Sequence, residues 1–412
     1  MQFQLSRKVI LASAIALASQ VSFVQAAGYG INEQSASYLG TGFAGRASNA
    51  IDASISATNP AGISFVEGTQ VSVGADVILE GGDFNGSIKD DPVNGTIPGS
   101  ASDFQKTAFV PFGYFVMPID DQWSFGLAGY APYGIELDYE DGWVGQSFAK
   151  KTSVQVMNIQ GTVSYKFNDD LSVGFGLIGS HVKGELTSKA YGLIDGNIEG
   201  DDNTVAWNIG TIWNVTDATT LGLAYHSKLD FKLGGTYTTS ISPEENVNLS
   251  IVMPEKLMAS ATHKLDEQWT VMADITWTRW SRFKEFDVVK SDGSGSAYYV
   301  PMNWDDTWAL SLGTSYQLND QWLLRAGYMF DESPVSDEFR TARSPDANRN
   351  WFTFGANWKV ADDMSVDFAY AYVKLKDGAI SEVSHGGPDY GMLEGTFSSS
   401  SHILGAQLNY KF

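Results

Sequence analysis

Alternation between apolar and polar positions is the dominant pattern of this chain. From Trp269 to Thr278 the odd positions are aromatic or aliphatic and the even positions are mostly polar. The stretches that start at Trp308 and Met364 repeat this pattern. A period of two predicts β-strands. Because the strands are long and carry aromatic residues at their ends, we expect the apolar face to contact lipid and the polar or small face to line a barrel lumen.

Short polar turns alternate with longer polar loops. The turns are rich in Asn and Asp, whose side chains hydrogen-bond their own backbone. Turns recur roughly every 50 residues, a period also found in kelch propellers, but each period here holds two long strands rather than four short ones. The expected turns are 119–122, 168–170, 216–218, 266–268, 319–321 and 361–363.

Fourteen strands are expected from this alternation, and the even number places both ends of the barrel on the side of the short turns. The predicted fold is therefore all-β and transmembrane: a 14-stranded antiparallel outer-membrane β-barrel over residues 69–412, multi-pass in the Gram-negative cell outer membrane. The strands are expected to start near Thr69, Gln105, Gln122, Thr152, Leu171, Thr204, Thr219, Asn246, Gln268, Asp306, Gln321, Arg349, Met364 and Ser400.

The two ends of the chain carry export signals. Arg7 and Lys8 precede an apolar run, and Val24 and Ala26 are the small residues of a cleavage site, which predicts a signal peptide over residues 1–26. The apolar run is too short to span a bilayer. Phe412 ends an alternating aromatic strand and resembles the C-terminal signal read by the barrel assembly machinery.

The composition of the chain limits the kinds of molecule that it can bind. The chain has no Cys, 42 Gly, 13% aromatic residues and a net charge of −22. Such acidity excludes nucleic acid as a natural partner. It suits soluble extracellular loops, and divalent cations bridging carboxylates to outer-membrane lipid and lipopolysaccharide.

Residues 27–68 do not follow the hairpin pattern. They are rich in Ala, Ser and Gly. Two alternatives are open: a disordered periplasmic arm, or a hatch (plug) folded inside the lumen, where small residues permit close backbone packing.

Catalytic and metal-binding patterns are missing from the sequence. The five His residues are dispersed without metal-ligand spacing, and no Gly-x-Ser-x-Gly motif is present. We expect no enzyme activity, no metal and no cofactor.

Several motifs resemble the FadL/TodX family, the outer-membrane transporters of long-chain fatty acids and aromatic hydrocarbons. The resemblance covers the whole chain after residue 26, and its motif Asp-x-Ser-Pro-Val is specific. The matching stretches are Ala27–Glu33, Asn59–Ala61, Trp277–Phe283, Asn303–Trp308, Arg325–Tyr328, Asp331–Val335, and Pro345, Asp346 and Arg349.

The resemblance implies a monomer whose N-terminal hatch closes the periplasmic side and whose ligand leaves sideways where the third strand is kinked. The hatch and gating residues would be Ala27, Gly28, Tyr29, Asn32, Asn59, Pro60 and Ala61. The lateral opening would involve Gly126, Gly129, Pro132 and Gly134, since proline lacks a ladder donor and glycine weakens pairing. The alternative is a strand that ends at Pro132.

The expected cargo is a long-chain fatty acid, held in an apolar pocket. Arg325 shares lumen-facing parity with Met329 and is the candidate for the ligand carboxylate. Alternatively it pairs with Asp274 or Asp367. Two rival functions stay open: uptake of monoaromatic hydrocarbons or other hydrophobic small molecules by the same fold, and a general diffusion porin.

Overall fold

The barrel is closed by its first and last strands. The computed structural model describes residues 27–385 and 387–412, so the expected signal peptide lies outside the described residues. Strand β1 (Gln70–Asp91) pairs antiparallel with β20 (Met392–Lys411), from Gln70 opposite Lys411 to Lys89 opposite Met392. No helix in the described ranges is long and apolar enough to cross a membrane.

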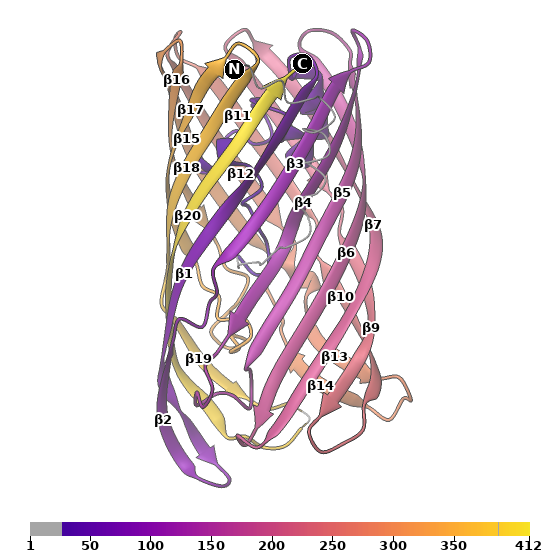
Figure 1. Cartoon of the computed structure of the whole chain (residues 1–412), viewed down its shortest axis with the longest axis vertical. Coiled ribbons are helices and arrows are strands. Elements are labelled where there is room, and N and C mark those ends of the chain that lie inside the picture. Colours follow the sequence, from indigo (N-terminus) through magenta and orange to yellow (C-terminus); the bar gives the residue numbers. More distant parts are fainter. Residues whose placement is uncertain (1–26, 386) are drawn as a thin grey trace, which may run out of the picture.

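Twenty strand segments in the described chain form fourteen passes through the wall (Figure 1). The pairs β8/β9 and β10/β11 each make one interrupted pass, and β2, β13, β14 and β19 lie toward the end with the long loops. The remaining bounds are β2 (Gly95–Ser102), β3 (Ala108–Pro118), β4 (Trp123–Asp138), β5 (Lys151–Lys166), β6 (Leu171–Ala190), β7 (Ile194–Thr216), β8 (Thr219–His226), β9 (Leu229–Thr239), β10 (Glu245–Met253), β11 (Lys256–Lys264), β12 (Trp269–Thr278), β13 (Glu285–Lys290), β14 (Ser296–Pro301), β15 (Thr307–Asn319), β16 (Trp322–Asp331), β17 (Arg349–Ala361), β18 (Met364–Leu375) and β19 (Gly378–Val383).

The short turns have the chemistry that the sequence predicts. Asp120 Oδ1 accepts hydrogen bonds from the backbone N–H groups of Gln122 and Trp123, at 2.9 and 2.7 Å. Asn168, Asp266 and Asn319 accept the same pair of bonds in their own turns. The C-terminus lies at this turn end, because Phe412 N–H donates to the Thr69 carbonyl.

The apolar face of each strand points outward, as predicted. Leu312 is 66% exposed, whereas its neighbour Ser311 is 3% exposed and faces the lumen. Met364–Leu375 shows the same alternation, with Phe368 outside and Asp367 inside. An apolar outer surface on a closed antiparallel barrel is the arrangement that lipid requires.

Some strands extend further toward the loop end than predicted. β7 begins at Ile194 rather than near Thr204, and β20 begins at Met392 rather than near Ser400. Above the apolar band the outward residues of β7 include Glu199 and Asp201, both exposed. The strands remain hydrogen-bonded there although apolar and polar residues do not alternate. The alternation therefore could not predict these parts of the strands.

Residues 27–68, the hatch, lie inside the barrel in the half toward the short turns (Figure 1). They contain α2 (Ala36–Leu39), α3 (Ile55–Thr58) and the 3-10 helix η2 (Pro60–Phe65); a second 3-10 helix, η3 (Trp280–Arg282), follows β12. Most hatch side chains are buried against the wall. The alternative of a disordered arm is therefore wrong.

Lumen-facing glycines allow the hatch backbone to contact the wall. A Cβ atom on Gly222 would lie 1.9 Å from the Ala47 carbonyl oxygen, and one on Gly174 would lie 2.2 Å from the Pro60 carbonyl carbon. Since real Cβ atoms do not approach so closely, a wall residue with a side chain would not fit at either of these two positions.

Candidate functional site

An interior cavity lies between the hatch and the barrel wall, with an empty volume of about 1120 Å³. The hatch contributes its first residues, Ala27, Gly30 and Ile31, and others further along its chain as far as Thr58. The wall contributes aromatic and aliphatic residues and about as many polar ones. Wall residues around the cavity include Tyr130, Pro132, Tyr133, Ile178, Leu229, Lys256, Met258, Trp280 and Asp331.

The third pass, β4, is irregular beside this cavity. Its ladder with β3 ends at Gly129, opposite Gly113. Its ladder with β5 shifts register between Tyr130 and Tyr133. The strand does not end at Pro132 but continues to Asp138, so the second alternative from the sequence is wrong. Gly126 lies within the regular ladder, opposite Val116.

The hatch replaces β3 as the pairing partner of β4. Ile31 N–H donates to the Pro132 carbonyl at 2.9 Å, and Gly134 N–H donates to the Tyr29 carbonyl at 2.8 Å. Gly30 and Tyr133 thus form an antiparallel bridge. Two of the predicted sets of residues, the first hatch residues and the irregular part of β4, are therefore in direct contact.

Aromatic side chains and a loop hold the first hatch residues. Gly28 N–H donates to Asp346 Oδ2 at 2.8 Å, and Tyr29 Oη bonds with Ser344 Oγ at 2.9 Å. The Tyr29 ring packs on Trp304, with ring centroids 5.2 Å apart. Gly28 has a φ of +63°, and a Cβ there would lie 2.8 Å from the Trp280 ring. Only glycine fits this position.

The other predicted hatch residues act at different places. Asn32 Oδ1 accepts from Arg46 Nη1 at 3.0 Å. Asn59 Nδ2 donates to the Ala47 and Thr211 carbonyls, at 2.6 and 3.0 Å, and its Oδ1 accepts from Ala61 N–H. Pro60 and Ala61 begin η2 against β5 and β6. Asn59, Pro60 and Ala61 fasten the hatch to the wall and are not in the cavity lining, whereas Asn32 is part of that lining.

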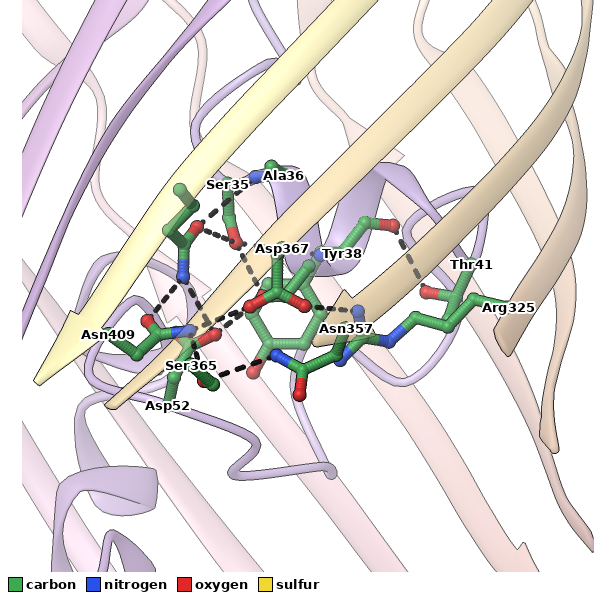
Figure 2. Close-up of polar contacts among 12 residues, drawn as sticks. Ser35, Ala36, Tyr38, Thr41, Asp52, Arg325, Asn357, Ser365, Asp367 and Asn409 are labelled. Carbon is green, nitrogen blue, oxygen red and sulfur yellow. Dashed lines mark hydrogen bonds and ion pairs between the residues drawn. The ribbon is translucent and has the colours of Figure 1, made fainter. Parts of the chain in front are cut away.

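Arg325 lies outside the cavity lining and has a partner within the barrel. It forms an ion pair with Asp367, both side chains being almost completely buried. Asn409 Nδ2 donates to Asp367 Oδ2 at 2.6 Å, and Gln407 links Asn409 to the hatch carboxylate of Asp52 (Figure 2). The ion pair with Asp367 is the alternative that the sequence offered, and it joins three strands to the hatch.

Charged groups of the hatch are buried as well. Arg46 forms an ion pair with Asp274 at 3.2 Å, and its Nη2 donates to Thr276 Oγ1. Burial raises the pKa of Glu33 to about 7, partly offset by its backbone hydrogen bonds. Burial, together with nearby Asp367, also raises the pKa of Asp52.

A second, smaller pocket opens toward the loop end, with an empty volume of about 470 Å³. Side chains of β5, β6, β7, β9, β10 and β13 line it, and nearly all are aliphatic or aromatic. They include Val154, Val182, Leu186, Ile198, Leu233, Ile251 and Phe286.

Comparison with known sequences assigns the chain to a protein family. Residues 15–412 match the family described as "Outer membrane protein transport protein (OMPP1/FadL/TodX)". The chain belongs to this family. It is a multi-pass outer-membrane protein that transports hydrophobic compounds and is not an enzyme.

The similarity to individual relatives extends over nearly the whole chain. Outer membrane protein P1 of Haemophilus influenzae is 29% identical, covering 98% of each protein. The long-chain fatty acid transport protein of Escherichia coli K12 is 27% identical over 100% of each. A FadL homologue from Pseudomonas aeruginosa has a TM-score of 0.86 at 23% identity, covering 94% of this chain and 100% of the other. The toluene transporter TodX of Pseudomonas putida has a TM-score of 0.69 at 19% identity, covering 94% and 100%. Both solved structures have the same fold as this chain.

Sequence reasoning missed several cavity residues of this FadL/TodX-family barrel. Lys256 and Met258 have the lumen-facing parity of β11, but parity alone does not say which level of the lumen is empty. Trp280 lies in a family motif that carried no assigned role. In the described ranges, no group of three or more His, Cys, Asp or Glu side chains is arranged to hold a metal ion.

Proposed function

We propose that this protein takes up long-chain fatty acids. The cargo first binds the apolar pocket toward the loop end, passes to the interior cavity and leaves sideways beside β4 when the first hatch residues move. The observation that carries the proposal is the composition of the cavity wall: it includes the first hatch residues and the irregular part of β4. A ligand in that cavity contacts both elements at once.

The free energy of burying apolar groups favours a long-chain fatty acid as the cargo. Each CH₂ group removed from water contributes about 0.8 kcal/mol, so a long acyl chain gains far more from an apolar pocket than a single aromatic ring does. The pocket toward the loop end has almost no polar lining. The interior cavity adds polar groups that a carboxylate needs and a neutral hydrocarbon does not.

Release requires that the hatch leave β4. Between residues 29 and 31 the hatch makes two backbone hydrogen bonds with β4, at 2.8 and 2.9 Å. Hydrogen bonds of this kind contribute about 0.5–1.5 kcal/mol each. Their loss is small enough for cargo binding to offset, and it leaves the β4 edge beyond Gly129 without a partner on the β3 side. Gly129, Pro132 and Gly134 then border the lateral opening.

Uptake by whole cells tests the cargo. We expect cells that lack their own transporter and express this protein to take up labelled oleate in a saturable manner, with little inhibition by toluene. Saturable toluene uptake without oleate uptake, by a folded barrel, would favour a monoaromatic cargo. Large single-channel conductance to ions would favour a diffusion porin.

A further inference from the structure

Lys256 is the first residue of β11, and it borders the interior cavity. Its ammonium nitrogen lies 4.8 Å from the centroid of the Tyr133 ring, over the ring face. A Cβ atom on Gly30 would lie 3.7 Å from the same nitrogen. The ammonium group therefore sits where the cavity, the first hatch residues and the irregular part of β4 meet.

The other basic side chains that line the cavity already have partners. Arg46 has Asp274, Asn32 and Thr276 as partners. His226 Nε2 bonds with the Thr58 carbonyl at 2.8 Å. By contrast, no carboxylate in residues 27–385 or 387–412 forms an ion pair with Lys256.

A carboxylate does line the same cavity, but it is not bound to the lysine. Asp331 is 5% exposed, and its Oδ2 has no hydrogen-bond partner among the described residues. Lys256 is half-buried, and among the described residues its ammonium group has the Tyr133 ring as a partner but no ion pair. Such a cation can still accept an anionic ligand, because a cation–π contact stabilises less than a charge-assisted hydrogen bond.

We propose that Lys256 binds the carboxylate of the cargo and is the residue that distinguishes fatty acids from neutral apolar compounds. This inference rests on the proposed function, since it assigns the cation within the proposed cavity. Binding of a carboxylate draws the ammonium away from the Tyr133 ring. Because Tyr133 forms the bridge with Gly30, this movement links recognition of the cargo to the hatch and to β4.

Binding of two matched ligands to the purified full-length protein tests the proposal. Oleate and oleyl alcohol have the same chain and differ in the charged headgroup. We expect Lys256→Met to weaken oleate binding about 10- to 100-fold, as the loss of one charge-assisted hydrogen bond implies. Oleyl alcohol binding should stay unchanged, and Lys256→Arg should retain most of the oleate affinity.

Lys264→Met is the matched control, because Lys264 lies on the same strand with the same parity but at the exposed turn end. It should leave both ligands unaffected. Asp331→Asn should strengthen oleate binding, since it removes a negative charge from the cavity. Unchanged oleate affinity in Lys256→Met, or an equal loss for both ligands, would overturn the assignment. If the wild-type protein binds oleyl alcohol but not oleate, the proposed fatty-acid function itself fails.

Discussion

Replacing Gly222 with valine is expected to prevent the hatch from docking while leaving the barrel closed. A Cβ atom there would lie 1.9 Å from the Ala47 carbonyl oxygen, so either the hatch or strand β8 must move. Overpacking typically destabilises by about 1–3 kcal/mol, which corresponds to roughly a 5- to 150-fold shift in the docking equilibrium. Trypsin cleavage after Arg46, which is buried in the docked hatch, should become faster by a comparable factor.

Gly161→Val is the control for this substitution, because a Cβ atom on Gly161 would have no neighbour within 4 Å. It should leave cleavage after Arg46 as slow as in the wild-type protein. Equal protection of Arg46 in Gly222→Val and in the control would show that the wall glycine does not determine the position of the hatch.

Replacing Arg325 with methionine should produce the largest loss of stability. It leaves the Asp367 carboxylate buried without its cation, and breaking a buried pair in this way costs about 3–5 kcal/mol. We expect the free energy of unfolding in lipid vesicles to fall by that amount. The double variant Arg325→Met with Asp367→Leu should recover most of the loss, because neither charge is then left alone.

Lys359→Met serves as the comparison, since Lys359 forms an ion pair with Asp362 at the exposed turn end. It should change the stability little. If Arg325→Met is equally mild, the ion pair does not anchor the wall, and water or a movement of the hatch must stabilise Asp367.

The barrel was predictable because the membrane makes its sequence periodic. Apolar residues such as Leu310 and Leu312 must face lipid, and most of the short turns carry a residue such as Asp120 that binds its own backbone. β6, β8, β17 and β18 begin at the predicted residues Leu171, Thr219, Arg349 and Met364. Where the strands extend beyond the lipid, as β7 does near Ile194, their outer face no longer has to be apolar. The sequence there lacks the alternation that predicts a strand.

The site was less predictable because it depends on contacts between distant segments. The parity of Arg325 correctly placed it in the lumen, but parity could not show that Asp367 lies beside it or that the cavity lies elsewhere. Similarly, the irregularity at Pro132 was visible in the sequence. That Tyr29 and Ile31 pair with this part of β4 became visible only in three dimensions.

Oleate uptake with the hatch reversibly fixed to β4 tests the central claim most directly. The chain has no cysteine, so the double variant Gly30→Cys and Tyr133→Cys places a single thiol pair on the antiparallel bridge between hatch and wall. Partners in such a bridge are about 4.5–5.5 Å apart at Cα, within the range for a disulfide. The single variant Tyr133→Cys sets the baseline. We predict that oxidation abolishes oleate uptake and that a reducing agent restores it to this baseline. Undiminished uptake by the fully oxidised protein would contradict release through movement of the hatch.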